Sequence, residues 1–195
     1  MARPLYAQLS LPALRANVAR ARALAPGTEL LAVVKANAYG HGLMRLLPAL
    51  TEAMWGIRRP VVLALRTAHY MRRILLLEGC FAPDELPEVA ARRLAVVVHS
   101  EDQVRMLELA RLERPLEVFV KVNTGMNRLG VAPADVVRTI ERLNQCESVA
   151  VLRLMTHFAR ADEEDGLKEP LAVFTAACRG MPYPRSLANS AGVVR

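Results

Sequence analysis

Two of the three lysines in this 195-residue chain stand where an amine could do chemistry. Arginine supplies all but three of the 26 positively charged side chains. Lys35 and Lys121 lie at the ends of apolar, β-branched runs, whereas Lys168 lies in a polar stretch and is expected at the surface. Arginine stays protonated in proteins, but a lysine amine can lose its proton and become a nucleophile. Lys35 and Lys121 are therefore the first candidates for a reactive group.

Lys35 has the more informative surroundings, the segment AVVKANAYGHG at residues 32–42. A buried strand is predicted to end at this lysine, and Gly40 and Gly42 allow a tight turn into the next helix, whose free N–H groups could meet an anion. A buried amine beside another cation deprotonates more easily and can condense with an aldehyde. The segment therefore predicts an aldehyde cofactor, and pyridoxal phosphate would act as an electron sink for a carbanion.

The elements that must position these residues follow a short strand–helix repeat. Seven nearly continuous apolar runs predict strands buried on both faces of a parallel sheet: residues 30–35, 61–65, 74–78, 94–99, 116–122, 149–156 and 186–190. A first helix is predicted at 11–24, and apolar spacing of three and four residues predicts helices at 83–92, 101–112 and 133–145, the second of these three starting after Ser100. Such a repeat fits either an open doubly wound sheet or a (β/α)8 barrel that lacks its eighth strand.

Composition excludes several classes of protein. A hydrophobic fraction of 53% is too high for a disordered chain. No apolar run approaches the ~18 residues of a membrane span, and the start has no apolar segment typical of a signal peptide. The net charge of +7 comes from scattered arginines, and an aromatic content of 5% offers few stacking platforms, so no nucleic-acid partner is expected.

The cysteines and histidines point away from disulfides and metals. Three cysteines, far apart and without a CxxC pair, predict neither a disulfide framework nor a zinc site, and they favour a reducing cytoplasm. No HxxxH or DxD pairing indicates another metal. No role is predicted for His41, His69 or His99, and His99 ends a predicted strand without a visible partner.

Four segments in order carry a resemblance to a known family. The segment VVKANAYGHG at 33–42 resembles the cofactor-lysine segment of the alanine racemase family, the amino-terminal barrel of fold-type III pyridoxal-phosphate enzymes. KVNTGMNRLG at 121–130, LMTHFA at 154–159 and SLANSA at 186–191 resemble three further motifs of that family. The resemblance spans nearly the whole chain and implies an α/β fold, an incomplete (β/α)8 TIM-type barrel with about seven strands present.

The resemblance also implies roles for individual residues. It implies that pyridoxal 5'-phosphate contacts a set of six residues: Lys35, Tyr39, Arg128, His157, Asn189 and Ser190. Lys35 would bind the cofactor aldehyde and act as the base for the α-proton of the D-enantiomer. Tyr39 and Ser190 would contact the phosphate, and His157 would lie beside the pyridine ring.

Two basic residues of the second motif are expected to work together. Arg128 would reach the cofactor's phenolic oxygen and the carboxylate of an amino-acid substrate, a task that suits its forked donors. Lys121 resembles the lysine that many family members carbamylate, and the negative charge so formed would hold Arg128 in position.

Members of the family consist of an amino-terminal cofactor-binding barrel and a C-terminal β-domain. Residues 1–195 are expected to form the barrel, truncated, without the β-domain. That β-domain carries a tyrosine that acts as the second base, and in the family it comes from the other subunit of a homodimer. The expected activity is the isomerisation of L-alanine and D-alanine, which supplies D-alanine for peptidoglycan or serves alanine catabolism. Whether this chain is active alone stays open, as does its oligomeric state.

One segment departs from the family pattern. Residues 54–72 do not resemble the GFAVA-type strand and acidic helix expected there. A one-base shift of reading frame, entering near Met54 and corrected near Arg72, is our hypothesis for this departure. The coding DNA decides it, because the shifted frame must restore a family-like segment.

Two other functions remain open. The chain could be a single-domain, non-enzymatic carrier of pyridoxal phosphate, although such a carrier has no use for a carboxylate-binding Arg128. It could also be the product of an inactive gene remnant.

Overall fold

Seven parallel strands form one sheet in the order of the sequence. The computed structural model describes residues 7–50, 54–57, 65 and 70–194. The strands in them are β1 (Leu31–Val33), β2 (Met54–Ile57), β3 (Ile74–Leu76), β4 (Ala95–Val98), β5 (Leu116–Lys121), β6 (Val149–Met155) and β7 (Arg185–Ser186). A doubly wound sheet reverses its strand order at a switch point, and this sheet does not. The order therefore confirms an incomplete barrel and excludes the open doubly wound alternative.

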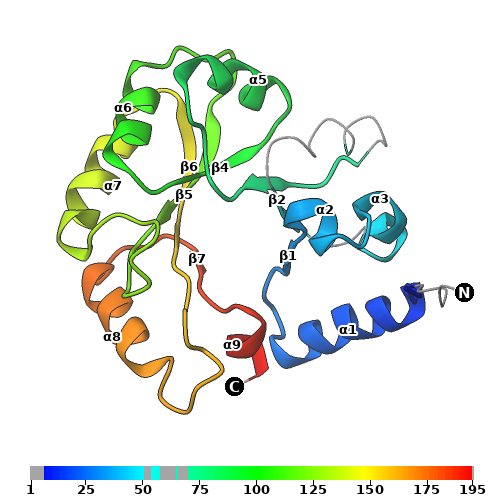
Figure 1. The fold of residues 1–195 in the computed structure, drawn as a ribbon. Coiled ribbons are helices and arrows are strands. Elements are labelled where there is room, and N and C mark those ends of the chain that lie inside the picture. The colour runs from blue at the N-terminus through cyan, green and yellow to red at the C-terminus, as the bar shows by residue number, and fades with distance from the viewer. Residues whose placement is uncertain (1–6, 51–53, 58–64, 66–69, 195) are drawn as a thin grey trace, which may run out of the picture.

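The helices form a layer outside the strands (Figure 1). The α-helices are α1 (Leu11–Leu24), α2 (Lys35–Tyr39), α3 (Leu43–Leu46), α5 (Leu86–Ala91), α6 (Glu101–Leu109), α7 (Val136–Asn144), α8 (Lys168–Ala177) and α9 (Ser190–Val194). Short 3-10 turns are η1 (Leu47–Ala49), η3 (Pro83–Glu85) and η4 (Pro133–Asp135). The predicted bounds of the first helix are confirmed, and the predicted start after Ser100 is confirmed by its side chain, which accepts from Gln103 N at 3.4 Å.

The second strand lies earlier than predicted. The second strand of the sheet, β2, occupies Met54–Ile57 and pairs with β1 and β3 in parallel, a position that was not predicted. Of the predicted strand at 61–65, residues 61–64 lie outside the described residues and Leu65 is helical. A parallel pair needs a crossover of a dozen or more residues. A strand ending at residue 65 would leave only residues 66–73 before Ile74, too few for that crossover.

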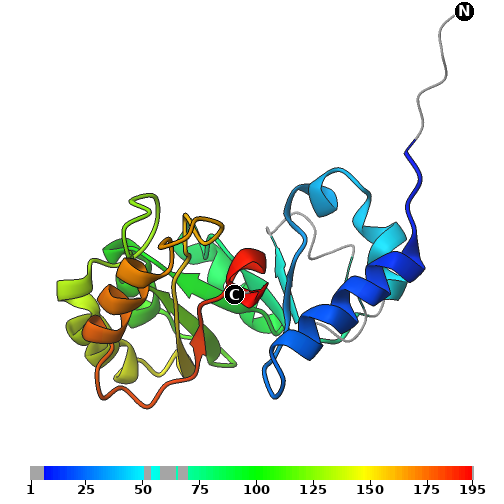
Figure 2. The same ribbon diagram turned by 90° about the horizontal axis from the view of Figure 1, so that it is seen from below.

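The two outermost strands are shorter than predicted. β1 ends at Val33 rather than at Lys35, and β7 contains two residues. Both are edges of the sheet, so each has one neighbouring strand and little cover (Figure 1). β1 is accordingly half-buried to exposed, not the buried strand predicted from its sequence. Helix α9 packs against α1 near this open side (Figure 2).

The central strands have two apolar faces, as predicted. Side chains that point into the barrel form one cluster: Leu75, Ala95, Val97, Phe119 and Met155. Alternate residues such as Val96, Val118 and Leu154 point outward into the larger cluster shared with the helices. Because side chains alternate along a strand, Glu117 and Lys121 lie on the same inward face as Phe119.

An ionic cluster closes the end of the barrel where the strands begin. Glu117 pairs with Arg73, at 3.3 Å between Nη1 and Oε1, and with Arg153. Arg73 also pairs with Glu29, and the Arg153 guanidinium lies 5.8 Å from the centre of the Phe119 ring. The candidate site residues follow the opposite, carboxyl ends of the strands. The ionic cluster is therefore separate from the candidate site and has a structural role.

Candidate functional site

The predicted site residues follow the carboxyl ends of four strands. Lys35 comes two residues after β1, Lys121 ends β5, His157 comes two residues after β6, and Asn189 and Ser190 follow β7. Parallel strands of a barrel end at one face, which is where barrel enzymes carry their catalytic groups. The fold therefore brings the four motifs to one mouth of the barrel.

Lys35 begins a turn of unusual handedness. Ala36, Asn37, Ala38 and Tyr39 all have φ between 51° and 55°, the left-handed region. The turn is fixed by the Asn37 side chain, which accepts from Leu43 N at 2.9 Å, and by Gly42 N, which donates to Asn37 O at 3.0 Å. The amine of Lys35 lies 5.9 Å from the centre of the Tyr39 ring. Four successive L-residues in this region are strained, and strain of this kind concentrates at functional sites.

The strain predicts an unusual response to glycine. Ala36 is exposed, with φ 51° and ψ 48°. Ala36→Gly removes a left-handed penalty of about 1–2 kcal/mol and adds about 0.4–1 kcal/mol of unfolded-state entropy, so we expect stability to rise by about 0.5 kcal/mol. The matched control, Ala19→Gly in exposed right-handed helix α1, should lower stability by about 1 kcal/mol. Urea unfolding measures both, and equal losses would contradict a strained turn.

Lys121 is the buried member of the site. Its side chain faces the barrel interior and the residue is 9% exposed. In the described part of the chain, no ion pair joins it to a carboxylate. Burial lowers the pKa of its amine, and the positive charges of Arg128 and Lys35 lower it further. Both effects favour the neutral, nucleophilic form of the Lys121 amine.

A pH-dependent stability follows from Lys121. Between its lowered folded pKa and its ordinary pKa of 10.5, the unfolded chain binds more protons, so stability rises with pH across that window. Lys121→Met should therefore stabilise the protein at neutral pH, by on the order of 1 kcal/mol, with a gain that shrinks toward pH 10.5. Urea unfolding at a series of pH values measures this. Exposed Lys168→Met is the control, and an identical pH profile for both variants would refute the assignment.

Arg128 is held out at the mouth by a closed loop. Val131 N donates to Lys121 O at 2.8 Å, and Asn123 N donates to Val131 O at 2.9 Å, which pins the two ends of the loop together. The Asn123 side chain accepts from Asn127 N at 3.1 Å and so shapes the loop from inside. Gly130 closes it at φ 138°, where a Cβ would lie 2.6 Å from Asn123 N. Arg128 itself is exposed.

His157 completes a cluster of basic side chains. It is half-buried, and burial lowers its pKa, as do the charges of Lys121, Arg128 and Lys35. These four residues therefore lie within electrostatic range of one another. A mouth with this concentration of positive charge suits a ligand with several negative charges.

The remaining predicted residues border this cluster. Asn189 donates to Phe158 O at 2.9 Å and accepts from Gly192 N at 3.0 Å, so it ties the end of β6 to α9. Ser190 is exposed at the start of α9, and Tyr39 is 59% exposed. In the described part of the chain, no hydrogen bond joins Tyr39 to Ser190, so the expected pair of phosphate contacts stays a prediction.

His99 has a partner that the sequence did not indicate. Its Nε2 lies 3.1 Å from Glu78 O, and its backbone N donates to Gln103 Oε1 at 2.9 Å. Gln103 is buried and also donates to Cys80 O at 3.1 Å. The expectation that His99 lacks a partner is therefore wrong: Gln103, four residues on, joins the ends of β3 and β4. His69 lies outside the described residues.

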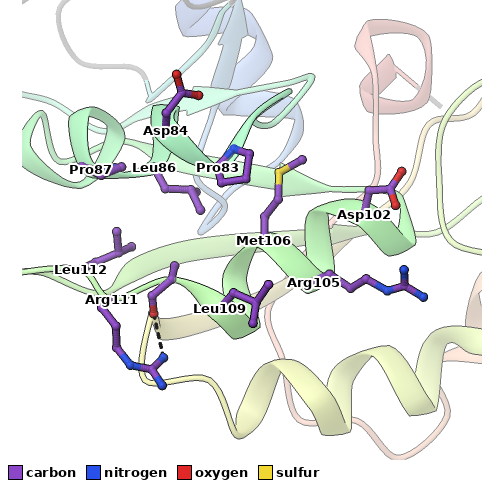
Figure 3. A pocket seen from close by; sticks show the side chains of 11 residues that line it. Pro83, Asp84, Leu86, Pro87, Asp102, Arg105, Met106, Leu109, Arg111 and Leu112 are labelled. Atoms are coloured by element: carbon purple, nitrogen blue, oxygen red, sulfur yellow. Dashed lines mark hydrogen bonds between the residues drawn. The ribbon is translucent and has the colours of Figure 1, made fainter.

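An apolar groove of about 610 Å³ lies elsewhere, on the outer surface between α5 and α6 (Figure 3). Leu86, Met106, Leu109 and Leu112 line it, with Asp84 and Arg105 at its rim. It contains none of the sequence-predicted site residues, so it is separate from the barrel mouth.

Within the described ranges, no helix is long and apolar enough to cross a membrane. The same ranges contain no group of three or more histidine, cysteine or acidic side chains that could hold a metal.

Comparison with known proteins gives consistent results over nearly the whole chain. The family model for the N-terminal domain of alanine racemase matches residues 9–195. The biosynthetic alanine racemase of Escherichia coli O6:H1 is 46% identical over 187 residues, which cover 93% of this chain and 52% of that protein. The alanine racemase of Nitrosospira multiformis is 44% identical over 200 residues, covering 100% of this chain and 56% of that protein.

The solved structures agree. The biosynthetic alanine racemase from Pseudomonas aeruginosa superposes with a TM-score of 0.88 at 38% identity, over 94% of this chain and 52% of that one. The chain spans about half the length of the curated relatives it matches.

Proposed function

The chain belongs to the alanine racemase family, and on this premise we propose that it forms the pyridoxal-phosphate-binding barrel of an enzyme that interconverts L-alanine and D-alanine. One observation carries the proposal: Lys35, Lys121, Arg128 and His157, from three separate motifs, meet in electrostatic range at the mouth of the barrel. Since the chain spans about half the length of its relatives, the complete reaction is proposed for the whole protein.

The residues present fit the proposed cofactor. Pyridoxal phosphate carries a phosphate and a phenolate oxygen, and the mouth presents four basic groups, with no carboxylate bonded to Lys121 in the described part of the chain. When bound, it would supply an electron sink that stabilises negative charge at the substrate's α-carbon. Lys35 would hold it covalently, Tyr39, Asn189 and Ser190 would border its phosphate, and His157 would lie against its ring.

Each basic residue has a distinct task in this proposal. Lys35 would remove or return the α-proton of the D-enantiomer. Arg128 would bind the substrate carboxylate, since its exposed guanidinium can donate two parallel hydrogen bonds. Lys121, whose pKa is lowered, would become carbamylated when its neutral amine adds to CO2 and releases a proton, and the resulting negative charge would orient Arg128.

The finer assignments are proposed on the same basis. We place the protein in the cytoplasm, acting on a small amino acid, in the supply of D-alanine or in alanine catabolism. The homodimer and the second domain with its opposite-face tyrosine are proposed for the whole protein, within which residues 1–195 would be the cofactor-binding barrel.

Trapping the cofactor on its lysine tests the proposal. The protein is incubated with pyridoxal phosphate, reduced with borohydride and mapped by mass spectrometry. We expect the adduct on Lys35, its loss in Lys35→Ala, and no change in Lys168→Ala, which removes an exposed lysine. An adduct mainly on Lys121, or equal labelling of all three lysines, would overturn the assignment.

A second measurement separates the racemase from the non-enzymatic carrier. The whole protein should exchange the α-hydrogen of alanine with deuterated water, as followed by NMR. Arg128→Ala should weaken this exchange and leave the adduct at Lys35 in place. Cofactor attachment without any exchange would favour the carrier.

A further inference from the structure

Two buried threonine hydroxyls join the loops that carry the basic cluster. Thr124 and Thr156 are 5% and 4% exposed, and their Oγ1 atoms lie 2.7 Å apart. Thr156 Oγ1 also lies 2.9 Å from the carbonyl oxygen of Val122 and donates to it. A hydroxyl has one proton, so Thr124 must be the donor to Thr156. The two hydrogen bonds therefore run in one direction: Thr124 donates to Thr156, and Thr156 donates to the carbonyl oxygen of Val122.

This hydrogen-bonded chain includes the sequence neighbours of two site residues and lies in the loop that carries a third. Val122 follows Lys121, Thr156 precedes His157, and Thr124 begins the loop that carries Arg128. Thr156 N also donates to Ser186 O at 3.2 Å, which ties the same point to β7. A displacement of either threonine would therefore move two of the basic side chains relative to each other.

Packing alone does not require these hydroxyls. Both threonines are β-branched and lie beside the buried Val122, where a valine would fill a similar volume. A buried hydroxyl lowers stability unless it finds a partner, and this pair is fully satisfied. Satisfied buried polar pairs fix one arrangement where apolar contacts would allow several.

We propose that Thr124 and Thr156 are positioning residues that hold Arg128 and His157 at fixed places around Lys121. The inference rests on the proposed function in that these groups are the ones that would bind the cofactor and the substrate carboxylate. The threonines themselves act through the loops that they join.

The pKa of His157 depends on the positions of the basic side chains around it and can be measured without any cofactor. The charged groups that face it are Lys121 from β5, Arg128 from the loop and Lys35 from α2, and their charges lower its pKa. We expect Thr124→Val to raise the His157 pKa by about half a unit, because the Arg128 loop moves away. NMR titration of the cofactor-free protein measures this, with the resonance assigned through His157→Gln. Thr124→Ser keeps the donor and should restore the wild-type value.

Ser148 provides the matched control for a structural role. It is 2% exposed and donates to Leu107 O at 2.6 Å, away from the barrel mouth. Ser148→Ala should lower stability and leave His157 unmoved. An unshifted His157 in Thr124→Val, or an equal shift in Ser148→Ala, would overturn the proposal. Thr124→Ala makes the same deletion with a smaller side chain if the valine variant does not fold.

The cofactor gives a second, independent readout. Thr124→Val should weaken the affinity for pyridoxal phosphate about tenfold, whereas Ser148→Ala should not. An unshifted His157 in a protein that still binds cofactor on Lys35 overturns the positioning role and leaves the proposed function intact. A shifted His157 in Thr124→Val, found together with a wild-type protein that binds no pyridoxal phosphate on Lys35, supports the positioning role and overturns the proposed function.

Discussion

Replacing Gly79 with alanine is expected to lower the free energy of unfolding by about 3 kcal/mol or more. Gly79 is buried after β3 with φ 69°, and an added Cβ would lie 2.2 Å from Val97 O and 2.5 Å from Gln103 Nε2. Neither neighbour can retreat cheaply: Val97 lies within β4, and Gln103 Nε2 donates to Glu78 O at 3.0 Å. Denaturant unfolding measures the loss.

Gly27 separates the two causes of that loss. Its φ of 75° nearly equals that of Gly79, yet a Cβ there would meet nothing within 4 Å. Gly27→Ala should therefore cost only the left-handed penalty of about 1 kcal/mol. The difference between the losses of unfolding free energy in Gly79→Ala and Gly27→Ala measures the steric clash of the added Cβ at the rim of the barrel. Equal losses would mean that the β3–β4 rim is not packed as described.

The buried middle of the fold could be predicted from the sequence because its signals are local and consistent. β4, β5 and β6 lie within the runs 94–99, 116–122 and 149–156. β4 and β5 are buried at nearly every position, so their side chains are largely apolar on both faces, and hydrophobic runs indicate such strands directly. Helix α1 was predicted to the residue, and the structure shows that Ser10 caps its start, since the Ser10 side chain accepts from Ala13 N at 3.3 Å.

The second strand was misplaced for a reason that is not local. Residues 61–65 are more apolar than residues 54–57. A strand ending at residue 65 would, however, leave too few residues for the crossover to β3. Only the pairing of β2 with both of its neighbours reveals the position. The reading-frame hypothesis for 54–72 stays a prediction, because much of that segment lies outside the described residues.

The residues of the candidate site could be proposed from the sequence, but their arrangement in space could not. Motif resemblance named Lys35, Lys121, Arg128 and His157, and the fold brings them together. The left-handed turn after Lys35 was not predicted, since alanine favours the right-handed helix. The only local signal was the pair of glycines that ends it.

The buried hydrogen bonds of Thr124, Thr156 and Gln103 were also not predicted. Thr124, Thr156 and Gln103 have ordinary surroundings in the sequence, and their partners lie 32 residues away for the threonine pair and 23 for Gln103 with Cys80. Hydrogen bonds between residues so far apart produce no periodic pattern in the sequence. A buried polar residue becomes informative only once its burial is known.

Helix α8 was likewise not predicted, because it begins in the polar stretch around Lys168. Its anchor is Phe174, which is fully buried, with the Arg185 guanidinium 5.8 Å from its ring centre. This ring belongs to the core cluster between the helices and the sheet. Phe174 is the buried residue of α8, so the packing of this helix depends mainly on one large side chain.

Phe174→Ala should accordingly lower the free energy of unfolding by about 3–5 kcal/mol, through lost apolar burial and the cavity left behind. Leu171→Ala, on the same helix but 44% exposed, is the matched control and should cost about 1 kcal/mol or less. Chemical unfolding of both variants gives the comparison. Since β7 is an edge strand of the described sheet, paired with β6, and is followed by Asn189 and Ser190, the first variant should also weaken cofactor binding. Similar small losses in both variants would show that α8 does not anchor this edge of the barrel.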